Sequence, residues 1–156
     1  MDCCSFGFNE ILKVISEKGI NSDTKLFMSV LFPKQFVDRS LNLLNKEKMT
    51  CYIAKESRRT FWKIETDKSQ YYSFAGSVMY CSCPSFQRDV IKEGKYPMCK
   101  HCLAIEICNA LQKGEKLQTD NVFKLEIIDD RKFADEIIRV ANETNLGLKQ
   151  KKSKQL

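Results

Sequence analysis

The stretch Cys81-Ser82-Cys83, followed after fifteen residues by Cys99-Lys100-His101, gathers three thiols and the only histidine of the chain. Thiolates and a neutral imidazole are ligands that suit tetrahedral Zn²⁺. In a flat strand Cys81 and Cys83 project from the same face. The second pair lies where an apolar-periodic helix begins, and free N–H groups at a helix start favour a thiolate. The spacing therefore predicts one Zn²⁺ bound by Cys81, Cys83, Cys99 and His101.

An alternative ligand set uses Cys102 in place of His101, which changes the pattern to C-x-C followed by C-x-x-C. Either set supplies four protein ligands, whereas catalytic zinc sites usually keep one position open. We therefore expect a structural metal and no enzyme. The six glycines match neither G-x-x-x-x-G-K-[ST] nor G-x-G-x-x-G, so no loop for nucleotide phosphates is predicted.

Periodicity around this stretch predicts strands before it and helices on both sides of it. The predicted strands are Met49–Ala54, Thr60–Thr66, Tyr71–Phe74 and Ser77–Cys81, which suit an antiparallel meander. The predicted helices are Asn9–Lys18 with a stop at Gly19, Asp23–Leu44 with a break at Pro33, a short one from Pro84 to Ile91, one from Leu103 to near Gly114, and Asn121–Glu143. The fold class is thus α+β: a small antiparallel β-meander flanked by helices, with a ββα zinc finger.

Composition indicates an ordinary globular chain, with 43% hydrophobic and 29% charged residues over 156 positions. The first residues, Met1-Asp2-Cys3-Cys4-Ser5, lack the basic and apolar regions of a secretory signal, and no apolar run reaches the ~18 residues that span a bilayer. We expect an intracellular protein with reduced cysteines. Cys51 and Cys108 are then small buried hydrophobes, and Cys3 and Cys4 are exposed end residues.

Charge is distributed unevenly over four predicted regions. An N-terminal helical region, 1–45, has five positive and five negative residues, and the β-meander and zinc finger, 46–116, have thirteen and eight. A C-terminal helical region, 117–146, has four and seven, and a basic, disordered tail, 147–156, has four lysines and no acid. The net charge of +6 therefore comes from the finger and the tail, although lysine-rich ends are usually just solvated.

Excess positive charge permits contacts with nucleic-acid phosphates. The predicted contact residues are Arg58, Arg59, Lys63, Lys95 and Lys100. Trp62, close to the two arginines in sequence, either stacks on a base or packs in the core, and the core is the commoner place for a large aromatic residue in a strand.

The segments Tyr80-Cys81-Ser82-Cys83-Pro84-Ser85-Phe86 and Met98-Cys99-Lys100-His101-Cys102-Leu103-Ala104 resemble the SWIM zinc-finger family, whose pattern is C-x-C-xₙ-C-x-H. The resemblance runs from about Phe27 to Gln112 and includes Leu41–Leu44, Met49–Ala54 and Ser57–Phe61. Cys102 departs from it, because an apolar residue is expected there. The resemblance implies a SWIM-type finger with Cys81, Cys83, Cys99 and His101 as ligands of one structural Zn²⁺.

Within that family the chain looks most like the SWIM subunits of Shu-type complexes. This resemblance implies a non-catalytic nuclear adaptor that pairs with a RecA-family recombinase paralogue, in a heterodimer or a larger complex. Such an adaptor promotes homologous-recombination DNA repair by supporting recombinase filaments on single-stranded DNA, with no membrane and no small-molecule substrate. Two other classes remain open: a stand-alone nucleic-acid-binding zinc module, and a thiol or redox enzyme using Cys99 and Cys102.

Overall fold

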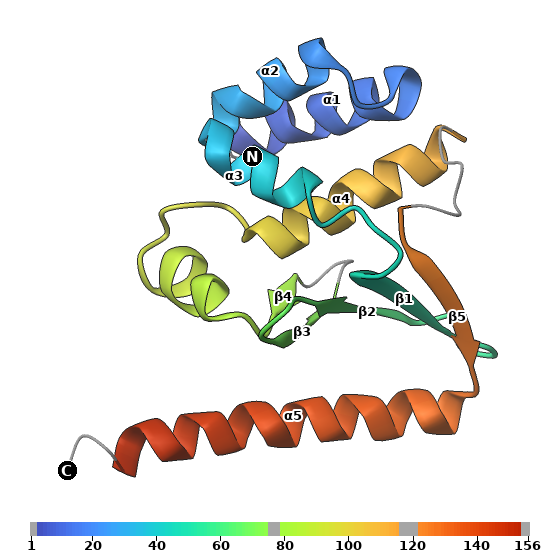
Figure 1. Ribbon diagram of the computed structural model, residues 1–156, viewed down its shortest axis with the longest axis vertical. Coiled ribbons are helices and arrows are strands. Elements are labelled where there is room, and N and C mark those ends of the chain that lie inside the picture. The colour runs from blue at the N-terminus through green and yellow to red at the C-terminus, as the bar shows by residue number, and fades with distance from the viewer. Residues whose placement is uncertain (1–2, 75–78, 116–121, 154–156) are drawn as a thin grey trace.

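The computed structural model describes residues 3–74, 79–115 and 122–153, and side-chain surroundings within 7–143 of these ranges. Its elements form layers, as Figure 1 shows. Helices α1 (Cys3–Lys18) and α3 (Lys34–Leu41) pack against helix α4 (Lys100–Lys113), and α2 (Ser22–Leu31) packs on α1 and α3. Helix α4 lies on one face of a five-stranded sheet, and helix α5 (Asp130–Ser153) runs along the other face. The α+β class is therefore confirmed.

The N-terminal helices end and begin at recognisable signals. Helix α1 (Cys3–Lys18) stops at Gly19, whose φ of +72° is the left-handed conformation that glycine adopts freely. Helix α2 (Ser22–Leu31) begins at Asn21, whose Oδ1 accepts hydrogen bonds from the backbone N–H groups of Asp23 and Thr24 at 2.9 and 3.0 Å. Pro33 separates α2 from α3 (Lys34–Leu41), which confirms the predicted break.

Four strands form the predicted antiparallel meander: β1 (Met49–Ala54), β2 (Thr60–Glu65), β3 (Gln70–Phe74) and β4 (Tyr80–Cys81). The sheet order is β4-β3-β2-β1-β5. Residues 75–78, which include the start of the predicted last strand, lie outside the described residues. The predicted short helix after Pro84 is the π-helical segment η1 (Phe86–Lys92).

The predicted helix from Asn121 to Glu143 is wrong over its first part. Strand β5 (Lys124–Ile128) pairs in parallel with β1, with Cys51 opposite Leu125 and Ile53 opposite Ile127. The apolar residues of this segment fit the periodicity of a helix as well as that of a strand, and pairing with the distant strand β1 decides between the two. The C-terminal region therefore contains a strand before its helix. Helix α5 continues to Ser153, so the backbone of the tail predicted to be disordered is helical up to that residue, and 154–156 lie outside the description.

Alternate residues of the strands supply two separate cores. Trp62 and Ile64 face α4 and pack with residues such as Ile105, whereas Phe61 faces α5 and packs against Phe133 with ring centroids 5.1 Å apart. None of the helices in the described ranges combines the length and hydrophobicity needed to cross a membrane.

Helix α1 lies very close to Gly114, the residue that follows α4. A Cβ atom there would lie 1.7 Å from the carbonyl oxygen of Ser16 in α1. This contact, together with the apolar residues of α1 and α4 in one core, fixes α4 between the N-terminal helices and the sheet. The C-terminal end of α4 is therefore held against α1.

Candidate metal centre

The first pair of candidate ligands is positioned by the pairing of β4 with β3. Cys81 lies opposite Ser73 at the end of β4. Ser82 then forms two hydrogen bonds with Tyr72: its backbone N–H donates to the Tyr72 carbonyl, and its Oγ accepts from the Tyr72 N–H, both at 2.9 Å. The residue between the two cysteines is thus fixed to the sheet, which keeps the backbone extended and brings both thiols to one side.

The second pair of ligands comes from the start of α4. Cys99 is the N-cap residue, with extended backbone at φ −84° and ψ 169°, and His101 lies in the first helical turn. Cys83 follows β4, and its Sγ accepts a hydrogen bond from the backbone N–H of Phe86 at 3.3 Å. This backbone N–H favours the thiolate form of Cys83.

The structure brings the four predicted ligands together. The Sγ atoms of Cys81, Cys83 and Cys99 and a ring nitrogen of His101 all lie within 4.8 Å of one another, and all four residues are buried. Nδ1 of His101 is 3.7 Å from Sγ of Cys81 and 3.9 Å from Sγ of Cys99. Ligand atoms around tetrahedral Zn²⁺, at about 2.3 Å for sulfur and 2.0 Å for nitrogen, are about 3.5–3.8 Å apart. The donor set and its spacing fit one zinc ion.

The imidazole of His101 is oriented by its surroundings. Its ring packs against Tyr71, with centroids 4.8 Å apart and planes at 39°. Nδ1 faces the thiols, while Nε2 is buried and finds no hydrogen-bond partner among the described residues. Nδ1 is therefore the nitrogen available to a metal, and Tyr71 limits rotation of the ring away from it.

Cys102 lies beside the cluster without joining the group of four. Hydrogen bonds with Cys102, Cys81 and Cys83 lower the pKa of the Cys99 thiol below its ordinary value. Hydrogen bonds with Cys102, Cys83 and Cys99 raise the pKa of Cys81. The geometry favours the ligand set with His101, and Cys102 is a buried neighbour of that set.

Two residues that help to build this site were missed in the sequence. Ser82 and Tyr71 act through backbone pairing and ring packing, and neither carries a signal in the pattern C-x-C. The other described cysteines behave as expected: burial raises the pKa of Cys51 to about 11 and that of Cys108 to about 12. Both belong to the core between the sheet and α4, Cys51 from β1 and Cys108 from α4. The side chains of Cys3 and Cys4 lie outside the description.

The predicted nucleic-acid residues do not form one surface. Arg58 and Arg59 lie in the exposed β1–β2 turn, beside the start of α5, whereas Lys95 and Lys100 belong to the finger at the other end of the sheet (Figure 1). Lys63 pairs with Glu65 at 3.1 Å. Lys95 lies over the ring of Tyr96, with Nζ 5.4 Å from the centroid.

Trp62 is not available to stack on a base. It is 2% exposed and packs edge-on against Phe123, with centroids 4.9 Å apart. The reading that places Trp62 in the core is therefore confirmed.

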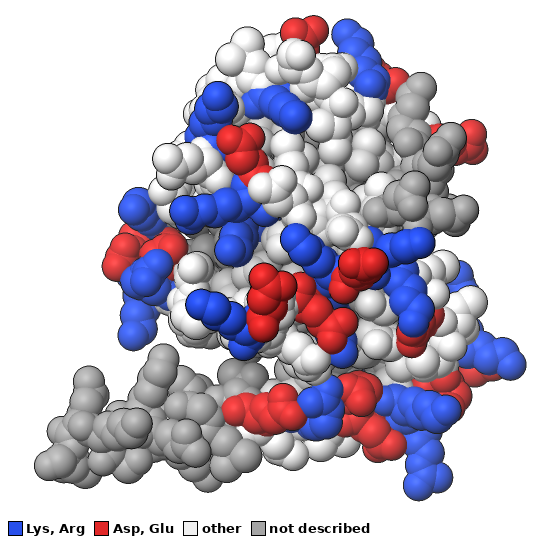
Figure 2. Space-filling view, viewed as in Figure 1, with Lys and Arg blue, Asp and Glu red and all other residues white. Residues whose placement is uncertain are grey.

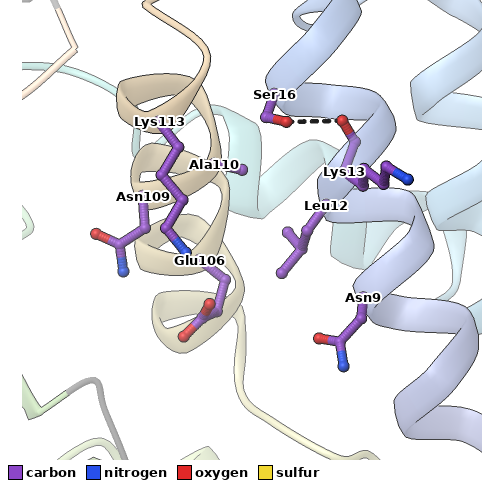
Figure 3. A pocket seen from close by; sticks show the side chains of 8 residues that line it. All are labelled: Asn9, Leu12, Lys13, Ser16, Glu106, Asn109, Ala110 and Lys113. Carbon is purple, nitrogen blue, oxygen red and sulfur yellow. Dashed lines mark hydrogen bonds between the residues drawn. The ribbon is translucent and has the colours of Figure 1, made fainter.

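A hollow of about 290 Å³ lies between α1 and α4 (Figure 3). Its side chains are mostly polar, and Figure 3 shows Lys113 extending along α4 toward Glu106. Burial raises the pKa of Glu106, and Lys113 opposes that shift. The residues that line it are Asn9, Leu12, Lys13, Ser16, Glu106, Asn109, Ala110 and Lys113. None of them is a candidate metal ligand, so this hollow is separate from the zinc cluster.

No family model matches the chain. It is similar to the zinc finger SWIM domain-containing protein 7 homolog of Dictyostelium discoideum, with 30% identity over 116 residues that cover 72% of this chain and 74% of that protein. It is also similar to zinc finger SWIM domain-containing protein 7 of Homo sapiens, with 30% identity over 88 residues, 53% of this chain and 62% of the human protein. Zinc finger SWIM domain-containing protein 7 of Mus musculus is 29% identical over 83 residues, which cover 53% of this chain and 54% of the mouse protein. The match thus spans only a little over half of the two mammalian relatives.

Proposed function

The chain belongs to the family of zinc finger SWIM domain-containing protein 7, and we propose that it is a non-catalytic adaptor whose partner surface is held in shape by one structural Zn²⁺. The observation that carries this proposal is the buried cluster of Cys81, Cys83, Cys99 and His101, with all ligand atoms within 4.8 Å. When bound, the ion would link the end of β4 to the start of α4.

Two features support a scaffold rather than a catalytic metal. Four protein ligands complete a tetrahedral zinc ion, so no position remains for water or substrate. The ligands are also buried beneath apolar residues of the same core, such as Phe86 and Met98. Fixing the two segments in advance lowers the ordering cost of binding a partner.

The proposed partner is a RecA-family recombinase paralogue, and the proposed process is homologous-recombination DNA repair in the nucleus on single-stranded DNA. The resemblance of the finger to SWIM subunits of Shu-type complexes supports both. Exposed apolar side chains on the described surface are consistent with protein contacts, since Val30 of α2 is 78% exposed and Ile127 of β5 is 59% exposed.

The test is affinity purification of the tagged full chain beside Cys83→Ser, with zinc measured in both. We expect the variant to lose the zinc and the co-purifying recombinase-like protein together. Cys51→Ala is the matched control, because it removes a buried thiol that is not among the four ligands. A zinc-free Cys83→Ser protein that still retains the partner would separate the metal site from assembly.

The second candidate function is a thiol or redox enzyme, favoured by one observation. Cys99 and Cys102 form a buried C-x-x-C pair, and this spacing is found in redox-active dithiols. A firmly bound Zn²⁺ would occupy Cys99 and block such chemistry. One zinc per purified chain would contradict the redox function, and a metal-free native protein with a Cys99–Cys102 disulfide would support it.

A further inference from the structure

Five exposed cations meet where the β1–β2 turn contacts the start of α5. They are called the basic corner here: Lys55, Arg58, Arg59, Arg131 and Lys132. Figure 2 shows Lys and Arg side chains at the lower right of the molecule, where Figure 1 places this turn and the start of α5. Residues that are more than seventy positions apart in the chain thereby share one surface.

Asp130 holds the two parts of the basic corner together. Its Oδ1 accepts a hydrogen bond from the backbone N–H of Glu56 at 2.9 Å, and its Oδ2 accepts one from that of Ser57 at 3.0 Å. The backbone N–H of Lys55 also donates to the carbonyl of Ile128 at 2.8 Å. These three bonds fix the turn against the segment that carries Arg131, so the cations keep a defined arrangement.

The cations of the basic corner outnumber the acids of the same two segments by five to three. Three acids lie in the same segments, namely Glu56, Asp129 and Asp130, but both oxygens of Asp130 are used by the turn. Lys132 pairs loosely with Asp129 at 3.9 Å. Among the residues that the structure describes, the other four cations of the corner form no ion pair within 4 Å. By contrast, Lys63, Lys124 and Arg139 are each paired with a glutamate.

We propose that the basic corner binds the phosphate backbone of single-stranded nucleic acid. Exposed guanidinium groups match phosphate oxygens through paired N–H donors, and a polyanion gains further from the release of its counterions. Trp62 is buried and cannot stack on a base, and contacts to phosphates carry no sequence information. The basic corner would therefore recognise charge and not base sequence. The inference rests on the proposed function and deepens it, because it assigns the nucleic-acid contact to this chain and not to its partner alone.

The test measures how salt changes the binding of a labelled oligothymidine strand to the zinc-loaded full chain. Each phosphate contact to a single strand contributes about −0.7 to the slope of log K against log salt. Five contacts predict about a 100-fold loss of affinity between about 50 and 200 mM salt. The variant Arg58→Asn with Arg59→Ala and Arg131→Ala leaves two contacts, and we expect about a 7-fold loss over the same range. Asn is used because the backbone of Arg58 is left-handed, with φ 59°.

The matched control is Lys13→Ala with Lys25→Ala and Lys34→Ala. It removes the same charge from exposed lysines of the three N-terminal helices, so it should keep the wild-type slope. Zinc content and melting temperature should be unchanged in both variants. An equal slope for the corner variant and the wild type, or an equal decrease in the control, would overturn the proposal, as would a wild-type chain that binds no oligothymidine.

Co-purification of the recombinase-like partner is measured in parallel, which separates this inference from the proposed function. A corner variant that keeps the partner and loses the salt-dependent binding supports the inference. A variant that loses the partner and keeps oligothymidine binding makes the corner a protein contact and overturns it. Absence of the partner from the wild-type purification would instead overturn the proposed function, whatever the oligothymidine result.

Discussion

Single residues outside the ligand set determine whether the four ligands meet. Ser82 occupies the one-residue gap between two cysteines, and its side chain and backbone both bond to Tyr72. The ligand types and their spacing could be predicted from the sequence, because zinc chemistry restricts them. The role of Ser82 could not, since it depends on a strand partner ten positions away.

Ser82→Ala should destabilise the zinc-loaded protein by about 1–3 kcal/mol, because it leaves the Tyr72 N–H without its acceptor. Urea unfolding of the two proteins measures the difference. Ser85→Ala is the control, since the Ser85 side chain forms no capping hydrogen bond at the start of η1. Equal free energies of unfolding for Ser82→Ala and the wild type would show that the bond contributes nothing.

Gly114→Ala should be destabilising by about 1–3 kcal/mol, because the new Cβ would lie 1.7 Å from the Ser16 carbonyl oxygen and the two helices would have to move apart. Thermal unfolding measures the effect. Gly7→Ala provides the opposite control: it lies inside α1 with nothing within 4 Å of a Cβ, so it should stabilise by about 0.4–1 kcal/mol. If Gly114→Ala melts at the wild-type temperature, the close approach of α1 and α4 is not a constraint.

Elements were predictable where their signal is local. The helix break at Pro33, the stop at Gly19 and the meander from β1 to β3 follow from residue types within a few positions. Strand β5 was missed because its identity depends on parallel pairing with β1, which is about seventy residues earlier. The hydrogen bonds that Asp130 accepts from the β1–β2 turn could not be predicted for the same reason, because they too join residues about seventy positions apart.

The turn held by Asp130 should respond to acid. Hydrogen bonds from Glu56 and Ser57, with the charge of Arg59, lower the pKa of the Asp130 carboxyl below its ordinary value. A lowered folded-state pKa means that the stabilising contribution is complete above about pH 4, the unfolded value, and is lost as pH falls through the folded value. The N–H resonances of Glu56 and Ser57, followed by NMR during acid titration, should shift in that lower range. In Asp130→Asn the same resonances should show no such transition, and an unchanged titration in this variant would exclude Asp130 as the cause.

At the scale of the whole molecule, the cluster of ligands belongs to a core shared with the N-terminal helices. Cys81, Cys83 and Cys99 lie in the same group of buried residues as Ile15 of α1 and Met28 of α2. The core between the sheet and α5 is separate and contains none of the ligands. Loss of the metal should therefore act unevenly on the two sides of the sheet.

Removing zinc with a chelator should lower amide-exchange protection in α1, α2 and the start of α4, and leave the residues of β2 that face α5 better protected. Structural zinc contributes an apparent ~10–16 kcal/mol, comparable with the whole stability of a domain. Hydrogen exchange with mass spectrometry resolves the segments, and re-addition of zinc is the control for reversibility. Uniform loss of protection throughout the described chain would show a single cooperative unit.

The parallel pairing of β5 with β1 has a consequence for synthesis on the ribosome. All four ligands precede residue 102, whereas β5 begins only at Lys124. The nascent chain can thus close around its ion while β1 still presents a bare row of backbone donors and acceptors on one side. During that interval the free edge of β1 can pair with another extended segment, and it is protected only when β5 has been synthesised and pairs with it.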